Sequence, residues 1–106
     1  MDAFEIADVE ASRVAAGRLY EEFLRVGSMS AGLYVLEAGA TDPQTPHAQD
    51  EIYHVISGRA QIEVDGASRA VQPGSVVFVA KGVDHRFHSI KQRLELLVVF
   101  APAESS

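Results

Sequence analysis

Three side chains with metal-binding chemistry occur in two short segments of the chain. The first segment carries His47 and Glu51, which are four residues apart, and the second carries His85. Alternate side chains of an extended strand share a face, so His47 and Glu51 would point the same way. An imidazole and a carboxylate on a face that otherwise buries apolar groups are costly unless they share a partner. A divalent cation would satisfy both groups.

The same alternation sorts the neighbouring residues. The expected inward residues of the first segment, besides the two above, are Thr45, Gln49, Tyr53 and Val55. In the second segment His85 and Phe87 share one face, while His88 faces outward, as His54 does in the first segment. We expect Thr45 to be a polar pocket wall, and Phe78 to belong to the core together with Tyr53 and Phe87.

The elements that must position these groups are strands. From about residue 30 onward, short runs rich in Val, Ile, Leu, Tyr and Phe alternate with glycine-bearing turns such as Asp65-Gly66 and Pro73-Gly74. The expected strands lie near residues 18–26, 31–38, 51–57, 60–65, 68–72, 75–80, 85–90 and 93–101. This number and spacing of strands predicts an all-β sandwich or barrel.

The two ends of the chain are expected to lie outside the barrel, which we place at residues 18–101. Residues 1–17 form an N-terminal extension, either a strand or a short helix that spans Asp8 to Ala16 and stops at Gly17. Residues 102–106 are expected to be a flexible tail.

The first segment resembles the first signature of the cupin family. That signature reads Gly, five residues, His-x-His, three or four residues, Glu, six residues, Gly. The sequence matches it without a gap at Gly39, His47, Glu51 and Gly58. Thr45 stands where the first histidine of the signature is expected.

The second segment resembles the second cupin signature. That signature reads Gly, five residues, Pro-x-Gly, two residues, His, three residues, Asn. It matches at Gly74, Gly82 and His85, with Ala80 in place of the proline and Ser89 in place of the asparagine. The two signatures lie about 35 residues apart, and the resemblance covers roughly residues 31 to 100. It implies a double-stranded β-helix, also called a jelly-roll barrel, with a short N-terminal extension.

The resemblance implies that His47, Glu51 and His85 are ligands of one divalent metal ion. Two histidines and a carboxylate form a facial triad that leaves coordination positions open, and iron, zinc, manganese and nickel are all drawn to such donors. Gln49 lies two residues from His47 and is expected to be a fourth ligand or to lie just outside the ligands. The expected pocket walls are Thr45, Tyr53, Val55, Ile62, Val64 and Phe87.

Three functions follow from these expectations. The first is a metal-dependent enzyme, such as a dioxygenase, isomerase or lyase, acting on a small organic molecule. The second is a binding or sensing module that holds a small molecule without converting it. The third is a purely structural barrel without metal.

Composition narrows the partners. The 106 residues suit one domain, and the net charge of -6 opposes binding to phosphate backbones or anionic membranes. The absence of cysteine limits any metal site to nitrogen and oxygen ligands. The segment Met1 to Glu5 lacks a basic start and an apolar run, so we expect a cytoplasmic protein with a small-molecule partner and neither nucleic acid nor membrane.

We also expect a homodimer, because one strand is apolar on both faces. Leu94 and Leu96 suit one face of residues 93–101, yet Leu97 and Val99 make the other face apolar as well. Pairing two barrels would bury this second face. The rival explanation is that the N-terminal segment covers it within one chain.

Overall fold

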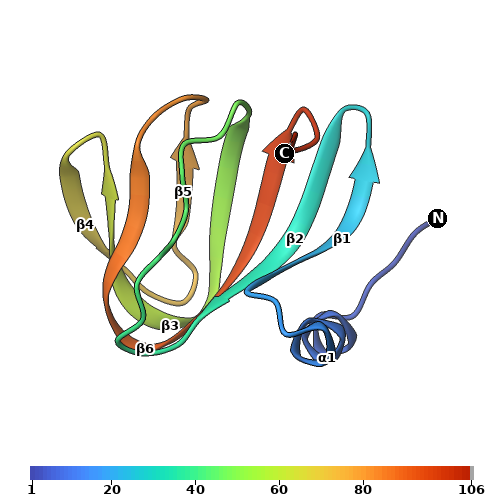
Figure 1. Cartoon of the computed structure of the whole chain (residues 1–106), viewed down its shortest axis with the longest axis horizontal. Coiled ribbons are helices and arrows are strands. Elements are labelled where there is room, and N and C mark those ends of the chain that lie inside the picture. Colours follow the sequence, from blue (N-terminus) through green and yellow to red (C-terminus); the bar gives the residue numbers. More distant parts are fainter. Residues whose placement is uncertain (106) are drawn as a thin grey trace.

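The computed structural model describes residues 1–105, which form six strands and one helix (Figure 1). In chain order these are α1 (Ile6–Ala16), β1 (Tyr20–Val26), β2 (Met29–Leu36), β3 (Asp50–Val64), β4 (Ala67–Val71), β5 (Val76–Val79) and β6 (His85–Ala101). The helix ends at Gly17, whose φ of 67° is left-handed, as the sequence predicted for the helical alternative. All strand pairs are antiparallel, in the order β1-β2-β6-β3-β4, and β5 pairs with the first part of β3.

Two pairs of predicted strands are single bent strands in the structure. Residues 51–57 and 60–65 merge into β3, and residues 85–90 and 93–101 merge into β6. The β3–β6 register shifts near Gly58, which has a φ of 97°. A Cβ atom there would lie 2.2 Å from the carbonyl oxygen of Arg93. The glycine therefore allows the strands to bend together, and a bend of this kind does not end a strand.

The inner face of the curved sheet forms the main core. Alternate residues of β6 point inward, and Leu94, Leu96, Val98 and Phe100 are only 0–2% exposed. Tyr53, Val55 and Ile62 of β3 and Phe87 of β6 join them in one buried cluster. The predicted inward face of residues 93–101 is thus confirmed.

The helix covers one part of the outer face. Val9 of α1 packs with Leu33 and Val35 of β2, which are 0% and 1% exposed. Figure 1 places α1 beside the end of the sheet formed by β1 and β2. The N-terminal segment therefore covers β2 within the same chain. Among residues 1–105, no helix is both long enough and apolar enough to cross a membrane.

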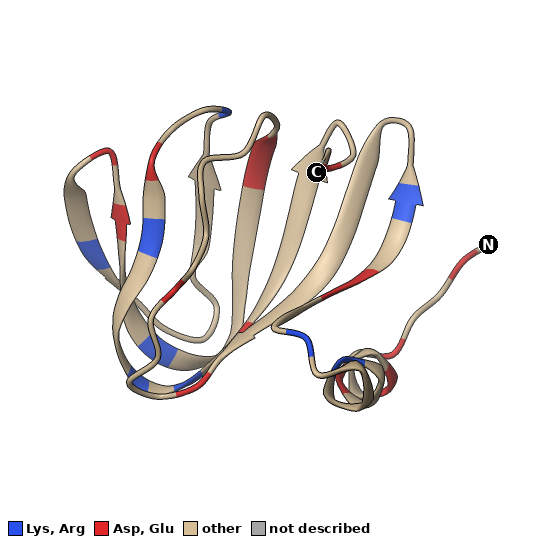
Figure 2. Ribbon diagram, viewed as in Figure 1, with Lys and Arg blue, Asp and Glu red and all other residues tan. Residues whose placement is uncertain are grey.

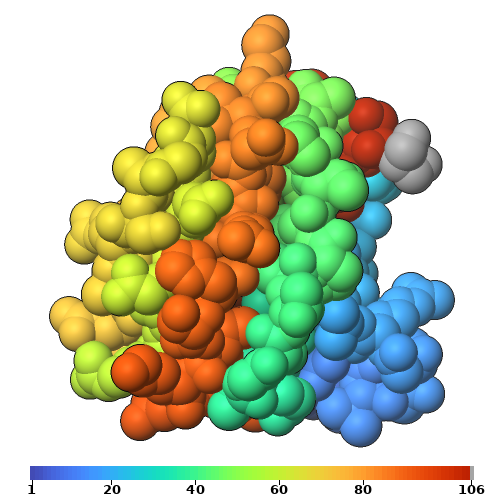
Figure 3. Space-filling view, turned by 60° about the vertical axis from the view of Figure 1, so that its left-hand side comes forward, coloured from blue at the N-terminus to red at the C-terminus, as the bar shows by residue number. Residues whose placement is uncertain are grey.

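The loop of residues 37–49 runs along the first half of β6 without forming a strand. Gly39 donates a backbone hydrogen bond to Ile90, and Gly82 donates one to His47. Figure 3 shows this loop, in teal and green, lying against orange residues from the last third of the chain. The loop thus closes one side of the barrel and brings His47 to its end.

Residues 102–105 turn back toward β1 and β2. The backbone N–H of Glu104 donates to the Ser30 hydroxyl at 2.8 Å, and Arg25 donates to the Glu104 carbonyl at 2.6 Å. The flexible tail expected at residues 102–106 is therefore anchored at Glu104, because two polar groups on neighbouring strands bind its backbone. Ser106 lies outside the described residues.

A second part of the outer face stays exposed. Residues 29–36 and 96–101 contain no Lys, Arg, Asp or Glu, and both stretches are tan in Figure 2. Ile52 pairs with Phe78 and with Val99, and His54 pairs with Val76 and with Leu97, so these side chains share the outer face. Ile52, Val76 and Phe78 are 43%, 64% and 60% exposed. We name the apolar side chains Ile52, Val76, Phe78, Leu97 and Val99 the outer patch.

The outer patch corrects one expectation and refines another. Phe78 was expected in the core, but Val79 of the short strand β5 is 1% exposed and points inward, so alternation turns Phe78 outward.

The helix α1 covers only the β1–β2 part of the outer face and does not reach the outer patch. A second copy of the chain, related by a two-fold axis, would cover the remainder.

We expect the outer patch to hold a homodimer, so that Phe78→Lys gives a monomer. A lysine in the interface would leave a charge unpaired and desolvated, whereas in the monomer the side chain is largely exposed. Light scattering should give about twice the 11.4 kDa chain mass for the wild type and the chain mass for the variant. Val14→Lys, at an equally exposed apolar position on α1, is the control and should stay dimeric. A wild-type mass near that of one chain at micromolar concentration would contradict the dimer.

Candidate metal centre

The structure brings together the three residues that the sequence singled out. His47, Glu51 and His85 each offer one ligand atom, and these atoms all lie within 4.8 Å of one another. Glu51 points inward from the start of β3, and His85 is the first residue of β6. Both side chains are 1% exposed, while that of His47, at the end of the 37–49 loop, is 17% exposed.

Some polar atoms of Glu51 and His85 are buried without hydrogen-bond partners among the described residues. Nδ1 of His85 donates to the Val83 carbonyl at 2.9 Å, which turns Nε2 toward Glu51. Nε2 lies 3.1 Å from Oε1 of Glu51, but the two groups are not oriented as a hydrogen bond. Within residues 1–105, both Glu51 oxygens and His85 Nε2 therefore have no hydrogen-bond partner. Buried polar atoms left in this way cost about 1 to 3 kcal/mol each, and a cation between them would remove that cost.

The carboxylate also affects the ionisation of its neighbours. Burial of the imidazole lowers the pKa of His85, but the Glu51 carboxylate and the Val83 carbonyl outweigh burial and raise that pKa above its usual value. Burial raises the pKa of Tyr53 well above its usual value, and Glu51 adds to the shift. The Tyr53 hydroxyl therefore stays protonated at neutral pH and donates to Oε1 of Gln44 at 2.8 Å.

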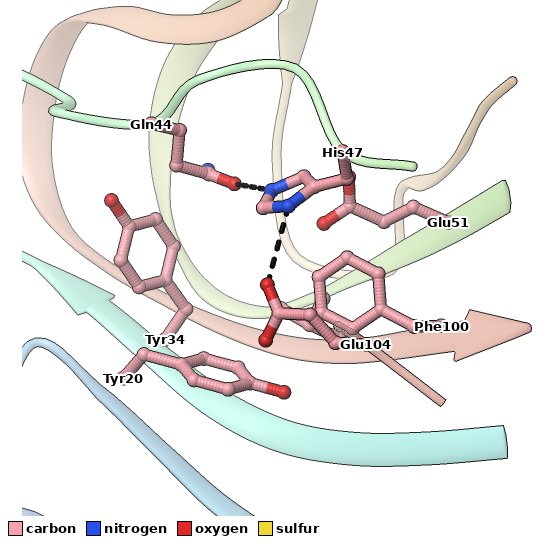
Figure 4. Close-up of a pocket in the computed structure, with 8 residues that line it drawn as sticks. Tyr20, Tyr34, Gln44, His47, Glu51, Phe100 and Glu104 are labelled. Carbon is pink, nitrogen blue, oxygen red and sulfur yellow. Dashed lines mark hydrogen bonds and ion pairs between the residues drawn. The ribbon is translucent and has the colours of Figure 1, made fainter. Parts of the chain in front are cut away.

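The His47 ring is held between two oxygen atoms. Nε2 lies 3.0 Å from Oε1 of Gln44, and Nδ1 lies 3.2 Å from Oε2 of Glu104 (Figure 4). The ring also packs edge-on against Phe100, with centroids 4.8 Å apart. These contacts fix the imidazole beside Glu51.

The buried carboxylate of Asp42 ties the 37–49 loop to the barrel. Its Oδ1 accepts a hydrogen bond from the Tyr34 hydroxyl at 2.6 Å, and its Oδ2 accepts one from the backbone N–H of Phe87 at 2.9 Å. Both atoms of the loop residue Gln44 that can donate, the backbone N–H and Nε2, also bind Asp42. Asp42 therefore connects β2, β6 and the residue that contacts His47.

A cavity of about 120 Å³ lies beside the cluster (Figure 4). It is lined by Tyr20, Tyr34, Gln44, His47, Glu51, Val98, Phe100 and Glu104. A closed apolar cavity of about 150 Å³ is large enough for benzene. The cavity thus suits a molecule of about that size or smaller, between aromatic walls on one side and the candidate ligands on the other.

The predicted pocket walls lie elsewhere. Thr45 is exposed and does not line the cavity, because residues 41–47 form a loop in which strand alternation does not apply; Gln44 faces the cavity instead. Gln49 is buried, but its Nε2 donates to Ser105 at 2.7 Å, and it does not line the cavity either.

The other predicted walls belong to the core. Tyr53, Val55, Ile62 and Phe87 are 0–1% exposed in the main core cluster, and Val64 packs against that cluster. Val64 pairs with the candidate ligand His85 and Ile62 pairs with Phe87, so the end of β3 stays close to the ligands, but its side chains do not line the cavity. The cavity walls come from β1, β2 and the end of β6 instead.

The missed wall residues Tyr20 and Tyr34 are opposite each other in the β1–β2 register. The side chain of Tyr20 lies over Gly32 of β2, and a Cβ atom at Gly32 would be 2.2 Å from the Tyr20 ring. A glycine inside an apolar strand is a signal of such close approach, and it could have pointed to this wall. Nothing in the sequence pattern pointed to Asp42 or Glu104.

Comparisons with known proteins agree with this geometry. The profile of the cupin domain matches residues 32–100. An uncharacterized protein of Streptomyces coelicolor is 53% identical over 105 residues, which cover 99% of this chain and 100% of that protein. The match therefore extends well beyond residues 32–100.

Two solved structures show the same fold at low identity. The structure of KdgF from Halomonas sp. has a TM-score of 0.71 at 19% identity, over 78% of this chain and 76% of that one. An RmlC-like cupin family protein with a double-stranded β-helix fold, from Methanocaldococcus jannaschii, has a TM-score of 0.71 at 21% identity, over 78% of each chain. At these identities the likeness concerns the fold alone.

We predict that Asp42→Ala destabilises the protein by about 2 to 4 kcal/mol, because it leaves the Tyr34 hydroxyl and the Phe87 N–H buried without an acceptor. Urea unfolding of the metal-free protein measures the change in the free energy of unfolding. Tyr34→Phe removes only one of the hydrogen bonds to Asp42 and should cost about 1 kcal/mol. Equal losses in the two variants would show that Asp42 does not connect the loop to the barrel.

Proposed function

The chain belongs to the cupin family, and we propose that it is a small metal-binding cupin that acts on a small organic molecule held beside a divalent ion. The observation that carries the proposal is the group of buried ligand atoms of Glu51 and His85, which lack hydrogen-bond partners within residues 1–105 and face the His47 ring next to a cavity. Two imidazoles and a carboxylate fit the donor preferences of iron, zinc, manganese and nickel.

His47, Glu51 and His85 would hold the ion in this proposal. When bound, the ion would act as a Lewis acid on an oxygen of the substrate or bind oxygen for a dioxygenase reaction. The chain itself supplies a cavity with aromatic walls from Tyr20, Tyr34 and Phe100, which would orient a small substrate and exclude water from it.

The alternative is a binding module that holds the same kind of molecule without converting it. The cavity wall favours this alternative, because its tyrosine hydroxyls are poorly suited to act as bases. Burial raises the pKa values of Tyr20 and Tyr34, so both hydroxyls stay protonated at neutral pH and are poor bases. Oxygen consumption by the metal-loaded protein with small phenols, thiols and diketones, together with product analysis, would distinguish the two functions.

We predict that protein purified without a histidine tag carries close to one divalent ion per chain, and that His47→Ala or His85→Ala removes most of it. Each variant deletes one of three ligands, which lowers the affinity steeply. Elemental analysis measures the metal content. His54→Ala is the matched control, because His54 is exposed and should leave the content unchanged. A wild-type content below about 0.1 per chain after reconstitution at neutral pH would contradict the metal site.

We predict that metal affinity falls as the pH is lowered, and that the fall begins above about pH 6.5, the ordinary pKa of histidine. Only neutral histidine coordinates a metal, and the pKa of metal-free His85 is raised, so protons compete with the ion from a higher pH than they would at an isolated histidine. Equilibrium dialysis between pH 8 and pH 4 measures this dependence. Full retention of metal at about pH 4 would count against histidine ligation.

A further inference from the structure

The carboxylate of Glu104 reaches the candidate metal site from outside the part of the chain that matches the cupin domain. That match ends at residue 100, and Glu104 lies beyond the end of β6 at Ala101. Its Oε2 lies 3.2 Å from Nδ1 of His47, with side-chain exposures of 27% and 17%. Figure 4 shows the carboxylate on the cavity side of the His47 ring.

The position of Glu104 is fixed by contacts of its own backbone. Ser30, which is 0% exposed, accepts the hydrogen bond from the Glu104 N–H, and Arg25 donates to the Glu104 carbonyl. The next residue, Ser105, accepts a hydrogen bond from the buried Gln49. Three polar groups on different segments therefore hold this end of the chain in place, and the Glu104 side chain is among those that line the cavity.

A carboxylate on one ring nitrogen of a histidine fixes the other nitrogen. A proton on Nδ1 that is donated to the carboxylate lets Nε2 act as the ligand atom, provided that Nε2 gives up its present contact with Oε1 of Gln44, an oxygen that can only accept. Within residues 1–105, the group of candidate ligand atoms that all lie within 4.8 Å of one another consists of His47, Glu51 and His85 and does not include Glu104. Glu104 therefore contacts the candidate ligand His47 without being a candidate ligand itself.

We propose that Glu104 is a positioning residue that orients His47 for metal binding through Nε2. This inference rests on the proposed metal-binding function. In this arrangement the ion takes the place of the contact between Nε2 and Gln44, while the contact between Nδ1 and Glu104 remains. The segment of residues 102–105 then supports a metal ligand in addition to providing Glu104 as a lining residue of the cavity.

The test is the affinity of the metal-free full-length protein for Co²⁺, measured by competition with a chromophoric chelator. Glu104→Ala is expected to bind Co²⁺ about 10 to 100 times more weakly than the wild type. Glu104→Gln keeps an oxygen that accepts the Nδ1 proton and should restore the affinity to within about 5-fold of the wild type. Glu37→Ala removes an exposed carboxylate on another surface and is the control, expected to be unchanged.

Two further measurements separate positioning from coordination and from folding. The visible absorption spectrum of Co²⁺ reports its ligands, so it should be the same in Glu104→Gln as in the wild type. Thermal melts of the metal-free Glu104 variants should lie close to the wild type, because the hydrogen bonds of Ser30 and Arg25 involve only the backbone of Glu104.

Other outcomes would overturn the inference. Unchanged Co²⁺ affinity in Glu104→Ala would show that His47 needs no second partner. An altered Co²⁺ spectrum, with Glu104→Gln as weak as Glu104→Ala, would make Glu104 a ligand and exclude a positioning role. Failure of the wild-type protein to bind Co²⁺ at all would refute the proposed function and the inference with it.

Discussion

The burial of Glu51 and His85 is the constraint on which the site depends. Both side chains are 1% exposed and face each other at 3.1 Å without a hydrogen bond. Such a pair is costly in a metal-free interior, and replacement of one partner alone would leave the other charged group uncompensated. The surrounding structure keeps the pair in place, because Glu51 lies on β3 and His85 begins β6, and these two strands form the centre of the sheet. The sheet thus holds two buried polar groups at a local energetic cost, and this cost falls on two of the three candidate metal ligands.

The other side of the site is built by segments that are not strands. His47 lies at the end of the 37–49 loop, which depends on the buried carboxylate of Asp42, and Glu104 lies in the segment that follows β6. Loops carry the functional groups of many proteins because a rigid sheet can position them while their own backbones adjust. In this chain, side-chain hydrogen bonds of Asp42 and Ser30 hold these segments in place of sheet pairing. His47 is accordingly the most exposed of the three candidate ligands.

The sequence was sufficient for the barrel and for the ligand candidates, for two physical reasons. Regular alternation marked the inner face of residues 93–101, and glycine-bearing turns separated most strands. Glu51 and His85 lie at the starts of the paired strands β3 and β6, and His47 comes just before β3, so their spacing can be recognised in the linear sequence. Alternation failed at Thr45, because the loop of residues 41–47 has no regular period, and hence Gln44 was missed. It also did not indicate that Ile62 and Val64, which pair with Phe87 and His85, lie outside the cavity wall.

The remaining residues of the site could not be predicted because they depend on contacts between distant parts of the chain. Glu104 is separated from Ser30 by 74 residues, and Asp42 from the Phe87 N–H by 45. No local period connects such pairs, and a buried acid looks like any surface acid in a sequence. Tyr20 reaches the cavity only because β1 adds to the sheet beside β2 and because Gly32 leaves room for its ring. The set of candidate ligands thus follows from the common fold, whereas the cavity walls and the support of His47 come from β1, the 37–49 loop and the C-terminal segment. These are the parts of the chain that would decide what the proposed site binds.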